Sequence, residues 1–366
     1  MAEMQSFFNL HRAADSANGN VLIFTSEDLK TLTSNFHSNS LIGITQSGRF
    51  YRGQLRSAWS TGTEARNLTV KIWDQKPEFD NATTNEFLVR EEVKLSTHPS
   101  LNGHPSLAKL IGYCCEDEVK GVVYDLDPLG SLQNLVARGN LQVHEPKNHC
   151  LRSSVPVFFF LLADDLNWLQ RVEVILELAR LLDFIHSQEK QSLPIKFRAS
   201  NILLDWECKP KLCGTGADLN NFAQNPSSYF HLSTRGGSQG KMSTDIYSLG
   251  EILLGLIAKR AYEPEKLERE NHHLVVNSLV SNWAKNEYRP NGSLVHETLQ
   301  KDWGYTAEEG VELTELAIHS IEFFPRNRPS IKQILQHLEG LQVTQRLSDT
   351  RPRKKERKSP SSAMGI

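Results

Sequence analysis

Five cysteines are the side chains of this chain most able to bind a metal ion or to form disulfides. They are Cys114, Cys115, Cys150, Cys208 and Cys213. An odd number with no paired C-x-x-C spacing is the pattern neither of a disulfide framework nor of a structural zinc site. We therefore expect reduced thiols in an intracellular protein, and no metal site.

A basic segment between Arg346 and Lys358 is the second chemically distinctive feature. It holds seven Lys and Arg against two acids, a local charge of +5. The whole 366-residue chain has a net charge of −2, so the remaining residues together carry −7. Such a cluster can make a weak contact with an anionic membrane or bind an import receptor, and a solvated tail is the alternative. The acidic body gives no reason to expect nucleic-acid binding.

The elements that must position any site change in type along the chain. The first part predicts a short helix with Ser26 at its N-cap, strands over 41–55, 68–73 and 121–125, and an amphipathic helix over 85–96. The second part predicts helices over 169–186, 245–258, 308–323 and 330–341. The tail after Gln345 has few apolar residues and is expected to be disordered. No apolar run is long enough for a transmembrane helix.

Seven short motifs occur along the chain in one fixed order. They are Leu41 to Gly53, Val70-Lys71, Lys109 to Cys114, Val123 to Leu132, Ala199 to Asp205, Ser243 to Gly250 and Asn327 to Ser330. Their order and spacing resemble a protein kinase, and more narrowly the plant receptor-like cytoplasmic kinases.

The resemblance implies an α+β, bilobal protein-kinase-like fold over about residues 24–341. A small β-rich N-lobe would cover about 24–126 and a larger helical C-lobe about 127–341. Residues 1–23 would form an N-terminal extension, and 342–366 a basic disordered tail.

Nucleotide-binding candidates follow from the same resemblance. They are Gly43, Gly48, Lys71, Glu92, Tyr124 and Asn201. In the family a strand lysine pairs with a helix glutamate and contacts the phosphates, and an asparagine binds the metal. Lys71, Glu92 and Asn201 match these positions, with Glu91 an alternative partner for Lys71. Tyr124 matches the gatekeeper that precedes the hinge, and Asp245 and Arg328 match structural residues of the C-lobe.

The chain departs from the family where the chemistry is done. Thr45 replaces a glycine of the phosphate loop, and Phe50 replaces the small residue that roofs the adenine. Lys196 stands at the position of the catalytic base, and a protonated lysine cannot accept the hydroxyl proton. Gly214 stands at the position of the metal-binding aspartate, which leaves Asp218 as the alternative carboxylate. No Ala-Pro-Glu triplet follows, and we assign no catalytic residue.

These losses predict a catalytically inactive kinase, a pseudokinase, that works as a signalling adaptor or scaffold. The alternative is an active or weakly active serine/threonine kinase with atypical catalytic residues, and ATP and Mg²⁺ are expected as cofactors only in that case. Other protein kinases or receptor complexes are the expected partners. The expected location is cytoplasmic, with association with the plasma membrane through partners or a nuclear location as further options.

One segment, residues 139–163, suits neither the strand nor the helix at its flanks. Its apolar end, Val155 to Ala163, can be encoded by a pyrimidine tract that ends in a splice-acceptor sequence, and the reading phases of the two flanks agree. We therefore hypothesise a retained intron of 25 codons, with a genuine surface insertion as the alternative.

Overall fold

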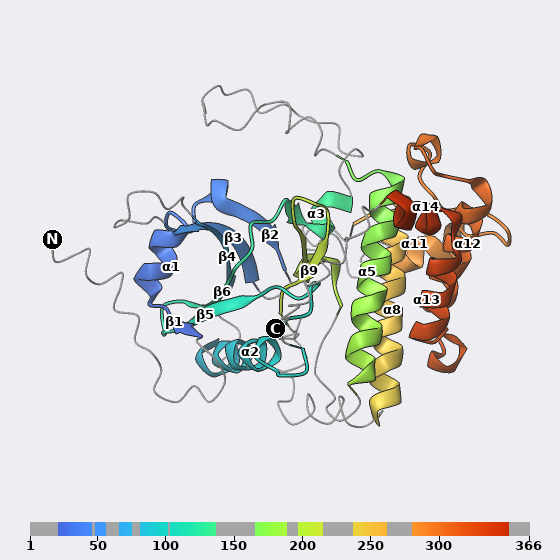
Figure 1. The fold of residues 1–366 in the computed structure, drawn as a ribbon. Coiled ribbons are helices and arrows are strands. Elements are labelled where there is room, and N and C mark those ends of the chain that lie inside the picture. The colour runs from blue at the N-terminus through green and yellow to red at the C-terminus, as the bar shows by residue number, and fades with distance from the viewer. Residues whose placement is uncertain are drawn as a thin grey trace, which may run out of the picture.

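The protein is described by a computed structural model that covers residues 21–45, 48–55, 66–74, 81–101, 103–136, 165–188, 197–214, 237–261 and 280–350. A sheet-rich N-lobe lies beside a helical C-lobe (Figure 1). The α+β, two-lobed architecture expected from the sequence is thus confirmed. Among the described residues, no helix has both the length and the apolar character needed to cross a membrane.

Six strands form the N-lobe sheet in the order β1-β5-β6-β4-β3-β2. In chain order these are β1 (Leu22–Ile23), β2 (Leu41–Ile44), β3 (Gly48–Leu55), β4 (Arg66–Trp73), β5 (Leu110–Cys115) and β6 (Lys120–Tyr124). Side chains alternate between the two faces of a strand. Val70 and Val123 accordingly pack with the short helix α1 (Ser26–Leu32), whereas Val122 and Tyr124 pack with α2 (Asn81–Ser96).

The C-lobe is built around two long helices, α5 (Trp168–Ser187) and α8 (Gly237–Ala258), which lie side by side (Figure 1). Around them are α3 (Leu132–Val136), α11 (Val280–Glu287), α12 (Ala307–Ser320), α13 (Ile331–Gly340) and α14 (Gln342–Thr350). A small sheet of β7 (Gly130–Ser131), β8 (Ile202–Leu204) and β9 (Pro210–Leu212) faces the N-lobe, and the turn η3 (Ala199–Asn201) leads into β8.

Every strand and helix predicted from periodicity is present. The helix α2 begins at Asn81 rather than residue 85, and α12 ends at Ser320 rather than residue 323. Three further local differences follow. The N-cap of α1 is Thr25 rather than Ser26, because Asp28 lies three residues further and completes a capping box with Thr25. The helix α8 begins at Gly237, whereas the sequence predicted it from residue 245. Its first turns are polar, so the apolar periodicity did not reveal them. The tail was predicted to begin at residue 342, but α14 continues the fold and buries Val343 against the C-lobe core.

The chain on either side of the predicted insert converges on one guanidinium group. Arg171 of α5 is buried and donates to the Leu166 carbonyl at 2.5 Å and to the Asp165 carboxylate at 2.7 Å. It also donates to the carbonyl of Val136, the last residue of α3, at 3.5 Å. Residues 139–163 themselves lie outside the described residues. Because both flanks contact one side chain, a few residues would suffice to join them.

We predict that excision of residues 139–163 leaves the fold intact. Each halving of a loop's length lowers its closure entropy by about 0.6 kcal/mol, so the thermal unfolding midpoint should be unchanged or higher by a few degrees, roughly 4 °C. Differential scanning calorimetry would measure it. A variant in which a Gly/Ser linker of equal length replaces the segment controls for loop length. An excised chain that is insoluble, or whose midpoint falls, would show that the segment is an integral part of the domain.

Candidate functional site

Lys71 lies on the face of the N-lobe sheet that turns toward α2. It is directly opposite Phe50 in the β3–β4 register and shares its face with Trp73, two residues further along β4. The Lys71 Nζ atom lies 4.8 Å from the Trp73 ring centroid and 5.7 Å from that of Phe50. The side chain is only 2% accessible, so this ammonium group has lost its water and needs a counter-charge.

Glu92 of α2 supplies that counter-charge. Its Oε2 atom lies 2.6 Å from Lys71 Nζ, and its Oε1 atom accepts a hydrogen bond from the Tyr124 hydroxyl at the end of β6. Burial and the Glu92 charge hold the pKa of Tyr124 well above its usual value, so the phenol keeps its proton and remains a donor. Of the two acids that the sequence left open, Glu91 pairs with Lys94 instead, at 2.6 Å.

Gly214, at the position of the family's metal-binding aspartate, lies directly against the same carboxylate. A Cβ atom added to Gly214 would overlap Glu92 Cδ and both of its carboxylate oxygens. The backbone at Gly214 also has a φ of +87°, which disfavours any side chain. The place where an aspartate side chain would begin is therefore already filled by Glu92.

Phe50, at the position of the residue that roofs the adenine in the family, lies in a cluster that spans both lobes. Phe50 and Ile42 of the N-lobe pack in one apolar cluster with Leu203 and Cys213 of the C-lobe. Both Phe50 and Leu203 are fully buried. Burial raises the pKa of the Cys213 thiol, which stays protonated. The two lobes thus touch directly where an open cleft would separate them.

The two glycines of the predicted phosphate loop have packing roles. A Cβ on Gly48 would overlap the Ile72 carbonyl of β4, and one on Gly43 would lie 2.8 Å from Ser131 Oγ of β7. Thr45, at the missing glycine, donates to the Gly48 carbonyl from its backbone N–H at 2.8 Å and from its hydroxyl at 3.0 Å. The Gly48 carbonyl thus binds a side chain, and the Thr45 N–H is already used.

The residues predicted to bind Mg²⁺ and ATP lie only partly within the described structure. Among the described residues, no group of three or more His, Cys, Asp or Glu side chains could hold a metal ion. Asp218 and Lys196 both lie outside the described residues. Asn201 is buried in η3, and its carbonyl accepts from the Cys213 N–H at 2.8 Å, which ties it to the strand end before Gly214. Nucleotide binding by the six candidates named above remains a prediction.

The hinge between the lobes is held by charges that sequence reasoning missed. Asp127 accepts from Arg52 Nη1 at 2.9 Å and from Asn67 Nδ2 at 2.9 Å, both in the N-lobe sheet. It also accepts from Trp206 Nε1 in the C-lobe, at 3.2 Å. A short polar run near a hinge carries no periodic signal, so only the fold reveals that Asp127 joins both lobes. Asn134 adds a second link, since its side chain donates to the Ile42 carbonyl at 3.1 Å.

The two residues predicted to be structural, Asp245 and Arg328, make contacts within the C-lobe. Asp245 of α8 lies 3.0 Å from His186 Nε2 of α5, which joins the two long helices. Arg328 donates to the Glu322 carbonyl at 2.8 Å and lies 4.9 Å from the Tyr247 ring centroid.

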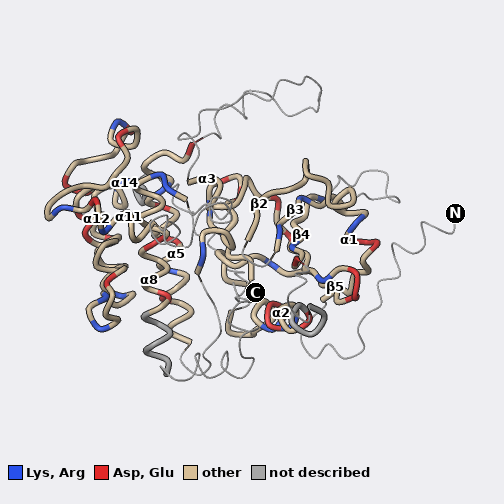
Figure 2. The backbone as a smooth tube through the Cα atoms, turned by 180° about the vertical axis from the view of Figure 1, so that it is seen from behind, with Lys and Arg blue, Asp and Glu red and all other residues tan. Residues whose placement is uncertain are grey.

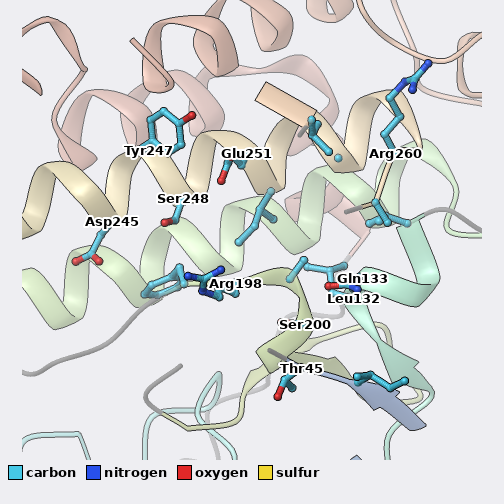
Figure 3. Close-up of a pocket in the computed structure, with 18 of the residues that line it drawn as sticks. Thr45, Leu132, Gln133, Arg198, Ser200, Asp245, Tyr247, Ser248, Glu251 and Arg260 are labelled. Carbon is cyan, nitrogen blue, oxygen red and sulfur yellow. The ribbon is translucent and has the colours of Figure 1, made fainter. Parts of the chain in front are cut away.

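A cavity of about 400 Å³ lies between residues 197–200, which belong to the loop that is catalytic in the kinase family, and the helix α8. Figure 3 shows Ser248 and Glu251 of α8 on one side, Arg198 opposite them, and Thr45 at the far rim. Burial raises the pKa of the Glu251 carboxyl, which accepts from Ser281 at 2.8 Å. The cavity shares no lining residue with the Phe50 cluster. This cavity therefore lies apart from the Phe50 cluster.

No family model matches the chain, but comparison with known proteins finds relatives. The chain is 28% identical over 353 residues to the EPD1-interacting receptor-like cytoplasmic serine/threonine-protein kinase 5D of Gossypium barbadense, which covers 92% of this chain and 68% of that protein. It is 28% identical over 336 residues to the serine/threonine-protein kinase BIK1 of Arabidopsis thaliana, which covers 87% of this chain and 76% of that protein. The chain spans about two thirds of the length of the first curated relatives that it matches.

Solved structures with the same fold include an apo pseudokinase, with a TM-score of 0.55 and 16% identity over 90% of this chain and 95% of that one. The pseudokinase DRIK1, drought responsive inactive kinase 1, matches with a TM-score of 0.51 and 17% identity over 89% of this chain and 97% of that one. The fold is therefore that of a protein kinase. More narrowly, the chain is a homologue of the plant receptor-like cytoplasmic serine/threonine kinases.

We predict that Lys71→Met destabilises the protein by roughly 3–5 kcal/mol, because it leaves the buried Glu92 carboxylate without its counter-charge. Urea unfolding measures the loss. The control is Lys94→Met, which removes an exposed ion pair of the same helix region and should cost less than about 1 kcal/mol. Equal losses for the two variants would contradict a structural role for the Lys71–Glu92 pair.

We predict that Gly214→Asp fails to restore phosphoryl transfer and destabilises the fold. The new side chain meets the Glu92 carboxylate, so the pKa of the introduced carboxyl is raised on folding. Stability is then lost as the pH rises through the range in which carboxyl groups ionise. Gly214→Ala is the control, because it has the same overlap and backbone strain without the charge, and its loss should not vary with pH. Parallel pH profiles for the two variants, or phosphate transfer by Gly214→Asp, would contradict this geometry.

Proposed function

We propose that this protein is a catalytically inactive member of its kinase group that acts as a signalling adaptor or scaffold. The observation that carries the proposal is the contact between Gly214 and Glu92: the metal-binding aspartate is absent, and its place holds another carboxylate. The chain keeps the contacts that shape a kinase and lacks those that do the chemistry. A protein of this kind acts by presenting a kinase-shaped surface to partners.

The size of the expected rate loss supports inactivity over slow catalysis. Loss of a general base or of one charge stabiliser typically lowers a rate by about 10² to 10⁴. The sequence has Lys196 in place of the base and Gly214 in place of the metal ligand. Kinases turn over at roughly 1 to 100 per second, so the combined losses leave little activity to measure, even if they do not multiply.

A weakly active kinase is the second candidate, and the Lys71–Glu92 ion pair favours it. Active kinases need such a pair to position the phosphates. In this protein the pair is fully buried and also bonded to Tyr124, so it has a structural reason to be present without a nucleotide. This is why the pair does not decide between the two candidates, whereas Gly214 favours the first.

The relatives indicate the kind of partner. The Gossypium barbadense protein is described by its name as EPD1-interacting and receptor-like. By analogy, we propose that this chain works beside receptor complexes or other protein kinases. We place it in the cytoplasm, and at the plasma membrane or in the nucleus when partners bring it there. The basic residues 351–358, which lie outside the described residues, would add a contact with an anionic membrane or an import receptor.

We predict that Mg²⁺ and ATP do not raise the thermal unfolding midpoint of the wild-type protein, because the Phe50 ring fills the adenine position. Phe50→Val should lower the free energy of unfolding by roughly 1–3 kcal/mol through the cavity it creates. That same cavity should let ATP bind and raise the midpoint of the variant. Thermal shift titrations with and without Mg²⁺ measure both effects.

The control for this experiment is Leu88→Ala, a truncation in the same apolar cluster from the side of α2. It should destabilise the protein without any response to ATP. The proposal of inactivity fails if wild-type protein transfers phosphate from Mg²⁺–ATP and loses that activity in Lys71→Met.

A further inference from the structure

The turn between α12 and α13 exposes two adjacent phenylalanines. Phe323 is 76% accessible and Phe324 is 52% accessible. Their ring centroids lie 5.1 Å apart with an interplanar angle of 88°, an edge-to-face pair. All five residues from 323 to 327 are exposed. We name residues 323–327 the aromatic turn.

The aromatic turn is rigid because Arg328 fixes its backbone. The Arg328 guanidinium donates to the carbonyl of Glu322 at 2.8 Å and to that of Phe323 at 3.3 Å. It also lies over the Tyr247 ring of α8, which anchors the turn to the centre of the C-lobe. Within the turn, the Asn327 N–H donates to the Phe324 carbonyl at 2.9 Å. Aromatic rings on a fixed backbone lose little conformational entropy when a partner covers them.

The charge around the aromatic turn is positive on a molecule whose body is acidic. The guanidinium of Arg326 lies 5.6 Å from the Phe324 ring centroid. Within the described part of the chain, no carboxylate pairs with Arg326. Residues 322–332 hold three basic side chains and one acid, and Figure 2 shows blue segments at the loop that leads into α13. A partner with carboxylates beside an apolar pocket would complement both features.

We propose that the aromatic turn is a docking surface for a protein partner that presents an apolar pocket bordered by acidic residues. Exposed aromatic and arginine side chains of this kind are the residue types that dominate binding energy at protein interfaces. One arginine and two rings are a small anchor for a bilayer, which requires a larger apolar area or several basic residues. This inference rests on the proposed adaptor function, since it names the surface by which the adaptor would engage its partner.

The test uses the full chain and two synthetic peptides that share the same apolar residues, one flanked by Glu and the other by Lys. Fluorescence anisotropy measures their dissociation constants. The acidic peptide should bind wild-type protein about tenfold more tightly than the basic one. The double variant Phe323→Ser, Phe324→Ser should weaken that binding about tenfold or more. Arg326→Glu should reverse the preference between the two peptides.

The matched control is Trp303→Ser, which removes another exposed aromatic ring, 69% accessible, before the opposite end of α12. It should leave the peptide affinity within about twofold of wild type. Arg328→Lys keeps the charge of that residue but loses the geometry of the guanidinium contacts, and should weaken binding by the acidic peptide.

Several results would overturn the proposal. They are binding of neither peptide, equal binding of both, and equal loss in Trp303→Ser. Two other occupants would give different results. A membrane is indicated if the wild type co-sediments with phosphatidylcholine–phosphatidylserine vesicles and the double variant does not. A second copy of the chain is indicated if the wild type forms a dimer that the double variant dissociates. Either result would replace the proposed partner. Phosphoryl transfer by the wild type would refute the adaptor function while leaving the peptide results to stand separately.

Discussion

The carboxylate of Glu92 is the constraint on which the rest of this structure depends. A buried charge must be neutralised and hydrogen-bonded, and here Lys71 and Tyr124 do both. Gly214 leaves the room that the carboxylate occupies, since any side chain there would collide with it. One interaction thus joins α2, the N-lobe sheet and the C-lobe segment after β9. The same arrangement holds the lobes together and places Glu92 where the family has its metal-binding aspartate.

Two further sets of contacts join the lobes beside this ion pair. Phe50 and Leu203 belong to one apolar cluster that spans the two lobes, and its burial adds to the ion pair. Asp127 then fixes the hinge with donors from both lobes. An enzyme needs the cleft between its lobes to open and close for substrate and product. A protein that works as a fixed surface gains from the opposite, because a rigid shape is already organised for its partner.

The C-lobe holds two exposed features, the aromatic turn and the cavity beside α8. Arg328 helps to hold the aromatic turn in place, and Tyr247 connects that turn to α8. The same helix lines the cavity beside the catalytic loop with Ser248 and Glu251. The long central helices therefore form the frame that positions both the cavity and the aromatic turn.

The sequence by itself determined the order and type of the elements, because apolar periodicity and the kinase motifs are local patterns. It also identified Lys71, Gly214 and Phe50 as informative positions, since each departs from or matches a motif of fixed spacing. It left the partner of Lys71 open, placed the N-cap of α1 one residue late and missed Asp127. Only the tertiary structure decided that Glu92 fills the place of the lost aspartate and that Phe50 packs in a cluster shared by both lobes. Such contacts depend on side-chain volumes brought together from distant parts of the chain, and no local pattern encodes them.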